Sequence, residues 1–217
     1  MSESTTAPGG AGRRIVVLDY GSGNLRSAER ALEHAGADVT VTDDLAAAAE
    51  AEGLVVPGVG AFAACMAGIE ALGAGPVIAE RVAAGRPVLG ICVGMQVLFE
   101  HGDEHGVVTK GLGLLPGGVT KLPARRLPHM GWNTVQAPAG SVLFAGLPAD
   151  ARFYFVHSYG VTDTAGLAAS GARVTTAEHG ADFVAAVERG SLSAAQFHPE
   201  KSAGTGAALL RNWLATL

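Results

Sequence analysis

The 217-residue sequence is poor in cysteine and in charged side chains. Its two cysteines, Cys65 and Cys92, are too few for a disulfide framework, and their spacing gives no reason to pair them. Charged residues make up only 16% of the chain and apolar residues 48%, a balance that disfavours disorder over most of its length. The formal net charge of -5 argues against nucleic acid or an anionic membrane as the main partner.

Long apolar runs are also lacking. No apolar stretch reaches the ~20 residues needed to span a bilayer. Residues 1–12 are small and polar, without the basic and apolar regions of a signal peptide. We therefore expect a cytoplasmic protein, in which a free thiol stays reduced. We also expect residues 1–12 to form a flexible tail before a single domain over residues 13–217.

The first half of the chain alternates strand-like apolar runs with helical patterns. The order predicts a mostly parallel sheet with helices on both faces. Expected strands lie at 15–19, 39–42, 54–56 and 87–91. Expected helices lie at 25–34, 62–72, 77–84 and 93–100, and an Ala-rich helix is expected between the strands at 39–42 and 54–56.

The second half has short strand patterns separated by turn signals. They predict a meander that extends the sheet or adds a small antiparallel layer. The expected strands are 133–136, 153–156, 172–176, 183–187 and 192–197. Ser202 is placed to cap a final helix that runs through Leu214. The predicted fold class is therefore α/β, with an antiparallel extension.

The segment Gly90-Ile91-Cys92-Val93-Gly94 lies between an apolar strand and a helix. A nucleophile elbow needs this setting, since the sharp turn exposes the nucleophile and small flanking residues leave room for it. The start of the helix favours a thiolate, and the N–H of Val93 is placed to face an oxyanion. The alternative is a buried structural cysteine at an ordinary strand end. Cys65 lies within an expected helix among small apolar residues, and we interpret it as a structural residue of the core or the surface.

A base and its orienting group follow the last strand in Gln196-Phe197-His198-Pro199-Glu200. In extended backbone, residues two apart point to the same side, so His198 and Glu200 project together. A cysteine nucleophile needs such a base, held by a third group. The alternative is a surface turn before a helix.

Two further segments complete the predicted pocket. The turn Pro57-Gly58-Val59-Gly60 follows a strand on the same side of the sheet, and its small residues let backbone N–H groups approach a ligand. We expect a second oxyanion donor at Val59 or Gly60. Gln96 lies one helical turn after Cys92, where it faces the same pocket.

The remaining histidines lack an acidic neighbour at the spacing of His198 and Glu200. His101 and His105, with Asp103 and Glu104, raise the possibility of a metal site, but the segment has the character of a solvated loop. We expect no metal.

Three segments together resemble the class I (triad-type) glutamine amidotransferases: Pro57–Gly60, Gly90–Gln96 and His198–Glu200. The resemblance runs from about Arg14 to the C-terminus. Within that family, residues 19–25, 128–133, 153–159 and 198–202 are similar to glutaminase subunits of imidazole glycerol phosphate synthase.

The resemblance implies a flavodoxin-like domain that hydrolyses L-glutamine without a metal or organic cofactor. It also implies a heterodimer with a (β/α)8-barrel cyclase. That subunit takes the ammonia and makes imidazole glycerol phosphate and AICAR in L-histidine biosynthesis.

Site residues follow from the same resemblance. Cys92 becomes the nucleophile, with His198 and Glu200 completing the triad. Oxyanion or glutamine contacts are implied for Gly58, Val59, Gly60, Val93, Gln96, Ser158 and Tyr159. Positions toward the cyclase are implied for Asn24, His129, Trp132, Asn133 and Lys201. Ammonia is useful only if it is not lost to water, so we expect weak activity from the isolated chain, with a misaligned oxyanion turn.

Three other functions remain open from the sequence. The first is another class I amidotransferase subunit, serving anthranilate or vitamin B6 synthesis, although the segments 129–133 and 154–159 argue against it. The second is a stand-alone γ-glutamyl hydrolase or cysteine peptidase, which shares the elbow but channels no ammonia. The third is a non-enzymatic flavodoxin-like module, which would make Cys92, His198 and Glu200 a coincidence.

Overall fold

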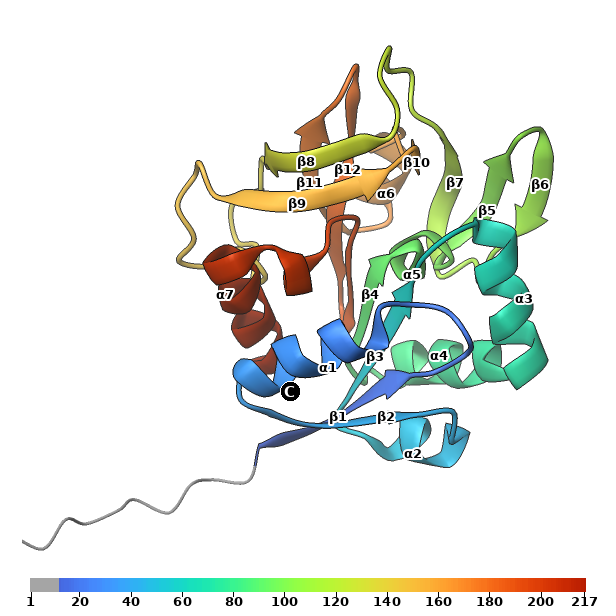
Figure 1. The fold of residues 1–217 in the computed structure, drawn as a ribbon, viewed down its shortest axis with the longest axis vertical. Coiled ribbons are helices and arrows are strands. Elements are labelled where there is room, and N and C mark those ends of the chain that lie inside the picture. The colour runs from blue at the N-terminus through green and yellow to red at the C-terminus, as the bar shows by residue number, and fades with distance from the viewer. Residues whose placement is uncertain (1–11) are drawn as a thin grey trace, which may run out of the picture.

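The computed structural model describes residues 12–217, so the tail expected over residues 1–12 lies outside it except for Gly12. A seven-stranded sheet forms the centre of the molecule (Figure 1). Its strands are, in spatial order, β11 (Arg173–Glu178), β12 (Asp182–Arg189), β13 (Leu192–Ala195), β4 (Val88–Cys92), β3 (Gly53–Gly58), β1 (Arg13–Leu18) and β2 (Ala37–Thr42).

Strand direction divides this sheet into two parts. β13, β4, β3, β1 and β2 are parallel to their neighbours, whereas β12 and β11 continue the sheet in antiparallel fashion. Every residue of β3 and β4 is buried, which explains why both strands are continuous apolar runs in the sequence. The predicted mostly parallel sheet with an antiparallel extension is confirmed.

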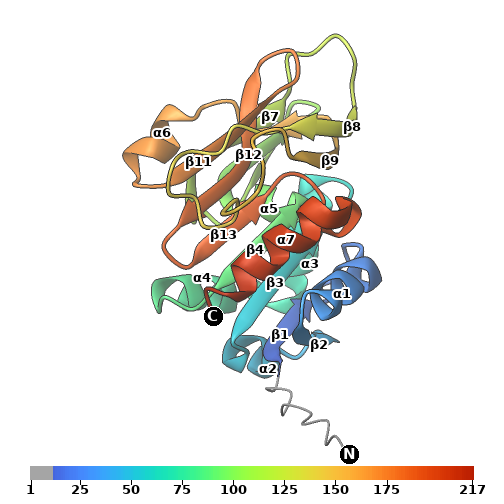
Figure 2. The same cartoon turned by 90° about the vertical axis from the view of Figure 1, so that its left-hand side faces the viewer.

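Helices cover both faces of the sheet (Figures 1 and 2). α1 (Leu25–His34) and α7 (Ala203–Leu214) lie on one face. α2 (Leu45–Glu50), α3 (Phe62–Leu72) and α4 (Ala74–Ala83) lie on the other. Each helix turns apolar side chains inward, as Trp213 of α7 and Ile69 of α3 show, both fully buried.

The second half of the chain adds two small sheets above the C-terminal ends of the central strands (Figure 1). One has the order β10 (Tyr159–Gly160), β7 (Leu115–Lys121), β5 (Phe99–Glu104) and β6 (Val107–Lys110). The other pairs β8 (His129–Thr134) with β9 (Arg152–His157). The short helix α6 (Ala165–Ala169) packs beside them.

Two expectations about local structure are wrong. The helix expected over 93–100 is only α5 (Val93–Gln96), and the chain enters β5 at Phe99. Val97, Leu98 and Phe99 are all fully buried, so this stretch has no polar face to turn toward solvent as a longer helix would need. The strand expected over 133–136 begins earlier, at His129.

The predicted cap at Ser202 is also wrong, although α7 does begin at the next residue. The Ser202 hydroxyl instead donates to the carbonyl of His198 at 2.7 Å and accepts from the N–H of Tyr154 at 2.9 Å. Ser202 therefore ties the end of the last strand to β9.

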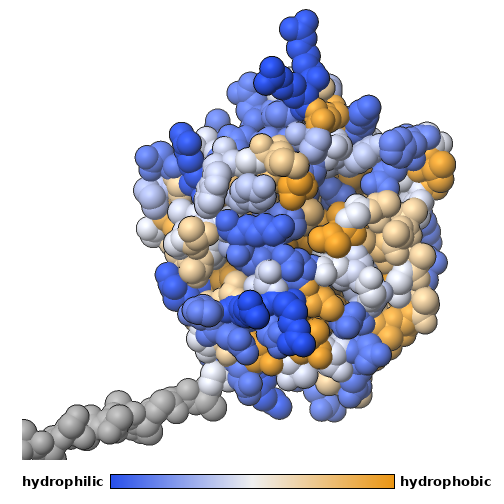
Figure 3. All heavy atoms as spheres, in the orientation of Figure 1, coloured by the Kyte–Doolittle hydropathy of each residue, from blue (hydrophilic) through white to orange (hydrophobic). Residues whose placement is uncertain are grey.

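The surface in view in Figure 3 mixes hydrophilic and hydrophobic residues. Exposed large apolar side chains occur on β6 at Val107 and Val108, and on β8 at Met130 and Trp132. Across residues 12–217, no single helix is both long and apolar enough to cross a membrane. α3 and α4 meet those criteria only together, across a bend of 89°.

Candidate active site

Cys92 stands at the turn from β4 into α5, as the sequence predicts. Its backbone φ is +56°, a region that side-chain-bearing residues rarely adopt. Strained backbone of this kind is typical of a nucleophile elbow. Gly94 makes the turn possible, because a Cβ there would lie 1.9 Å from the carbonyl oxygen of Val56 on β3.

His198 and Glu200 form a buried pair beside Cys92. His198 Nδ1 lies 2.7 Å from Glu200 Oε1, and both side chains are only 3% exposed. The pairing is as predicted, but its geometry is not the expected extended strand. His198 is extended, whereas Glu200 lies in a 3-10 turn, Pro199–Lys201, that brings its carboxylate back to the imidazole.

The contact with Glu200 sets the orientation of the imidazole. A carboxylate only accepts, so Nδ1 carries the proton and Nε2 is left for the pocket. Burial by itself lowers the pKa of His198, but hydrogen bonds and charge interactions with Cys92 and Glu200 outweigh it and raise that pKa to about 9. His198 is thus held ready as an imidazolium, the partner that a thiolate needs.

A cavity of about 250 Å³ opens over these groups. Cys92 and His198 line it, and Glu200 lies behind His198. The cavity also brings together most of the predicted oxyanion and substrate residues: Val59, Gly60, Val93, Gln96, Ser158 and Tyr159. Gly58 lies beneath it, packed against the N–H of Gly94 so closely that a Cβ would come within 2.4 Å.

The oxyanion turn is bound to the first loop of the chain. The N–H of Val59 donates to Ser22 Oγ at 3.2 Å, and that hydroxyl donates back to the Val59 carbonyl at 2.9 Å. Cys65 Sγ lies 3.3 Å from Ser22 Oγ and 3.4 Å from the same carbonyl. The Tyr20 hydroxyl donates to the carbonyl of Pro57. In this arrangement the Val59 N–H is engaged by Ser22.

Two glutamine side chains lie between the cavity wall and the thiol. Gln96 Nε2 donates to the carbonyl of Tyr159 at 3.0 Å and to Gln196 Oε1 at 2.9 Å. Gln196 Nε2 points toward Cys92 Sγ, 3.9 Å away. The predicted position of Gln96 on the pocket side of its helical turn thus matches its place in the structure.

The arrangement has the parts of a cysteine amidohydrolase: a thiol in an elbow, an oriented base, and backbone N–H groups around a small cavity. Residues 16–217 match the family model for glutamine amidotransferase class-I. The chain belongs to this family.

Relatives narrow the position of this amidotransferase within the family. It is 60% identical to the imidazole glycerol phosphate synthase subunit HisH of Streptomyces avermitilis, over 94% of this chain and 97% of that one. It is 61% identical to the subunit of the same name from Nocardia farcinica, over 94% and 99% of the two chains. The amidotransferase is therefore of the HisH type, as the segments 128–133 and 153–159 predict.

Solved structures confirm the fold. A crystal structure of a glutamine amidotransferase superposes with a TM-score of 0.72 at 20% identity, covering 93% of this chain and 99% of that one. A putative GMP synthase component from Thermoplasma acidophilum gives 0.70 at 21% identity, with 95% and 94% covered. At these identities the likeness concerns the fold alone.

The residues predicted to face a partner are spread over the amidotransferase. Trp132 on β8 is 49% exposed, and Lys201 lies at the edge of the active-site cavity. Asn24 precedes α1, and Asn133 is half-buried on β8. His129 is buried, 6% exposed, so any link between it and a partner passes through its neighbours.

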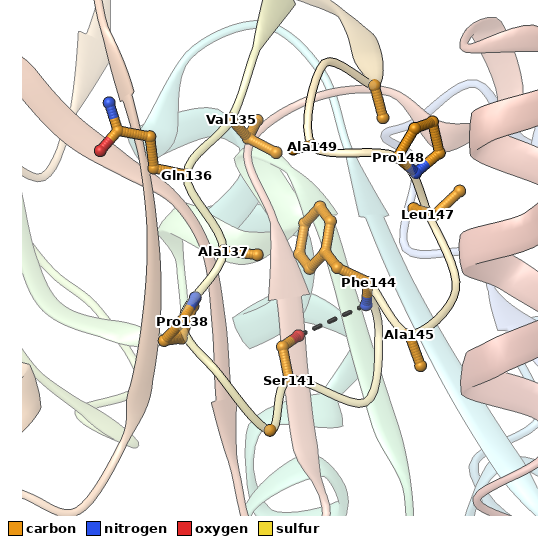
Figure 4. A pocket seen from close by; sticks show the side chains of 12 residues that line it. Val135, Gln136, Ala137, Pro138, Ser141, Phe144, Ala145, Leu147, Pro148 and Ala149 are labelled. Atoms are coloured by element: carbon orange, nitrogen blue, oxygen red, sulfur yellow. Dashed lines mark hydrogen bonds between the residues drawn. The ribbon is translucent and has the colours of Figure 1, made fainter.

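A larger hollow, of about 490 Å³, lies under the loop between β8 and β9 (Figure 4). Its wall includes Pro138, Phe144 and Pro148, and Ser141 Oγ accepts a bond from the Phe144 N–H there. Its lining residues carry no ionisable side chain. Chemistry in the amidotransferase therefore belongs to the smaller cavity that holds Cys92.

Three residues of the site have no functional role predicted from the sequence. Ser22 carries no local signal, because its contact with Val59 joins loops far apart in the chain. Cys65, interpreted above as structural, braces the same turn. Gln196 has a usable signal: it lies two residues before His198, and alternation in a strand puts both on one side. Among residues 12–217, no group of three or more His, Cys, Asp or Glu side chains is arranged to hold a metal.

Proposed function

We propose that this HisH-type subunit hydrolyses L-glutamine with Cys92, His198 and Glu200 and delivers the ammonia to a (β/α)8-barrel cyclase subunit. The cyclase would use it to make imidazole glycerol phosphate and AICAR in L-histidine biosynthesis. The observation that carries the catalytic part is the buried His198–Glu200 pair, whose histidine lines the same small cavity as Cys92 at its strained turn.

In the first half of the reaction the Cys92 thiolate attacks Cδ of glutamine. A C–S bond forms, and the carbonyl oxygen becomes an oxyanion that the N–H of Val93 and an N–H of the Gly58–Gly60 turn stabilise. One such donor lowers the barrier by about 3 kcal/mol. The His198 imidazolium then gives its proton to the departing nitrogen, the C–N bond breaks, and ammonia leaves.

In the second half His198 acts as a base. It takes a proton from water, and the resulting hydroxide attacks the γ-glutamyl thioester. The C–S bond then breaks, which releases glutamic acid and restores the Cys92 thiolate and the His198 imidazolium, and the acid loses its proton to solvent. Glu200 holds the imidazole through both steps and stabilises its charged form. Backbone at Ser158 and Tyr159, with Gln96, would hold the amino-acid end of the substrate.

The proposal of a cyclase partner rests on the names of the relatives and on exposed side chains of β8. The relatives are named as one component of a synthase, and β8 presents Met130 and Trp132 to solvent at 62% and 49% exposure. An exposed aromatic side chain on a strand is a suitable anchor for a protein interface. We propose that this face, with Asn24 and Lys201, meets the cyclase as a heterodimer. A cytoplasmic location, also proposed, would keep the Cys92 thiol reduced.

The catalytic assignment is tested with Cys92→Ala in the assembled complex. Glutamine-dependent synthesis should fall by roughly 10⁶-fold, as when a nucleophile of a hydrolytic triad is removed. Ammonia-dependent synthesis by the cyclase should survive. Full use of glutamine by Cys92→Ala would overturn the assignment.

Labelling provides the control. A glutamine-like electrophile should alkylate the Cys65→Ala variant, whose remaining thiol is Cys92, and should leave Cys92→Ala unlabelled. Labelling should also depend on His198. A non-enzymatic module would give neither the selectivity nor the dependence.

The partner is tested by glutaminase rates of the isolated chain and of the chain with the cyclase and its nucleotide ligand. We expect a weak rate alone and a higher rate in the liganded complex, because the Val59 N–H is engaged by Ser22 in the isolated chain. Equal rates would contradict the coupling. Turnover of a γ-glutamyl peptide without any partner would favour the stand-alone hydrolase.

A further inference from the structure

Two buried histidines outside the triad have no part in the mechanism above. His129, at the start of β8, is 6% exposed, and His157, at the end of β9, is 7% exposed. The ring of His129 is stacked between Phe155 and His179, with centroid distances of 4.8 and 4.3 Å. Histidines buried this deeply need every ring nitrogen satisfied.

The hydrogen bonds of the two histidines form a continuous chain in which each donor and each acceptor can be assigned. His157 Nδ1 lies 2.8 Å from the carbonyl oxygen of Tyr159, which can only accept, so Nδ1 carries the proton. In a neutral ring Nε2 then accepts, and it lies 3.0 Å from His129 Nδ1, which must be the donor. His129 Nε2 accepts in turn from the Asn133 side-chain amide, at 3.2 Å.

The hydrogen-bond chain also has fixed donors and acceptors at its Asn133 end. The same Asn133 amide group donates to the carbonyl of Glu178 at 2.9 Å, and its oxygen accepts from the N–H of Thr134. A proton added to His129 would point at a donor, so the chain holds only while both rings are neutral. Burial, reinforced by the charge of His179, lowers the pKa of His129 to about 4. Burial likewise lowers the pKa of His157 to about 4.

The far end of the chain reaches the glutamine cavity. The Tyr159 carbonyl that accepts from His157 also accepts from Gln96 Nε2, whose second hydrogen goes to Gln196. With both N–H groups used, the Gln96 amide is fixed in one orientation. Its oxygen is then left to accept from the ammonium group of a bound amino acid.

We propose that His129 and His157 are positioning residues of the glutamine site, holding the Tyr159 carbonyl and through it the amide orientation of Gln96. The proposal rests on the proposed glutaminase function. It concerns the amino-acid end of the substrate, remote from the scissile bond, so it acts on binding of glutamine more than on the chemical step.

The first test is spectroscopic and needs no activity. Nitrogen–proton correlation spectra of the imidazole rings at neutral pH should show His129 and His157 both neutral, with the proton on Nδ1. A proton on Nε2 of either ring, or an imidazolium, would overturn the chain.

The second test separates positioning from packing. His157→Phe keeps a ring between the sheets but removes one of the two donors to the Tyr159 carbonyl, and should raise the KM for glutamine about tenfold with a smaller change in kcat. His157→Asn places an amide nitrogen near the position of Nδ1, and should restore the KM to within about threefold of the native value. Both variants lose the bond to His129, so that loss does not distinguish them. A packing role predicts the reverse order, with the KM of His157→Phe near native and that of His157→Asn raised, because only Phe keeps the ring.

His179→Phe is the matched control. It keeps a ring against His129 and removes no bond of the chain, so its KM should be native. A KM raised as in His157→Phe would mean that ring packing, and not the chain, sets the pocket. Absence of glutaminase activity in the native complex would instead defeat the proposed function and leave the tautomer result standing.

Discussion

The two ends of strands β3 and β4 bury polar groups for opposite purposes. Where the strands begin, Arg81 of α4 is 2% exposed and its guanidinium donates to five backbone carbonyls, those of Ala48, Ala49, Ala51, Glu52 and Pro87. Where the same strands end, Gly58 and Cys92 pair in register, and the triad gathers around the thiol.

The two ends differ in the partners that surround their buried polar side chains. The acceptors around Arg81 are main-chain atoms that cannot leave, and they hold α2 and the starts of both strands together. At the other end Glu200 Oε2 has no hydrogen-bond partner within residues 12–217, and Cys92 is held at positive φ. Arg81 Nε likewise has no partner among these residues, so the two ends differ in what surrounds them and not in saturation. Arg81 is bound to fixed main-chain carbonyls that stabilise the fold, whereas Cys92 and His198 line a cavity.

Replacing Arg81 should destabilise the fold where β3 and β4 begin and leave the catalytic groups at the other end of these strands unchanged. Arg81→Met removes the guanidinium donors from five carbonyls, of which Pro87 and Ala51 keep another donor, and should cost about 3 kcal/mol of unfolding free energy. Urea denaturation measures it. The folded fraction should keep its native kcat.

Arg86→Met is the matched control. Arg86 donates to the neighbouring carbonyls of Glu50 and Ala51, at 2.9 and 3.4 Å, but is only half-buried. Arg86→Met should lower the free energy of unfolding by about 1 kcal/mol. If the two variants were equally stable, the contacts of Arg81 with the main chain would not be the source of stability.

The two ends also differ in how much the sequence reveals. The elbow at Cys92 and the pair at His198 and Glu200 are local patterns, readable because each joins a strand end to a short spacing. Arg81 carries no such pattern, since its acceptors lie in α2, in the residues just before β3 and in the residue just before β4, which only folding brings to it. The same limit hides Ser22, whose partner Val59 is far along the chain.

Helix lengths are mispredicted for a related reason. Residues 93–100 are expected to be helical, yet only Val93–Gln96 forms a helix, because Leu98 is fully buried and the chain enters β5 at Phe99. Sequence periodicity predicts elements that turn one face to solvent, and this stretch has none. The parallel core strands are predictable because burial on both faces makes them apolar throughout.

Glu200→Gln sharpens the account of the reactive end. It should lower kcat by about 10²-fold, less than the ~10⁴-fold when a serine hydrolase loses its carboxylate, because a thiol gives up its proton more readily than a hydroxyl does. Stopped-flow or steady-state glutaminase assays measure it. An unchanged kcat would remove Glu200 from the triad.

The contact of His198 with Glu200 also predicts how the glutaminase reaction depends on pH. The pKa of His198 is raised from 6.5 to about 9, so the imidazolium that protonates ammonia is lost as pH rises through about 9, and kcat/KM should fall there. Proton binding also favours the fold: this stabilisation is complete below about pH 6.5 and is lost through about pH 9. In Glu200→Gln the alkaline limb should move to lower pH.

The smallest expected effect is at Ser22, a residue of the first loop that holds the oxyanion turn in place. Ser22→Ala removes the hydroxyl that accepts from the Val59 N–H and donates to its carbonyl. The freed N–H can then turn toward the thiol, so the glutaminase rate of the isolated chain should rise about fivefold, the worth of one hydrogen bond. Ser22→Thr, which keeps the hydroxyl, should stay near the native rate. A rate that falls in Ser22→Ala would mean that Ser22 supports the productive turn and does not restrain it.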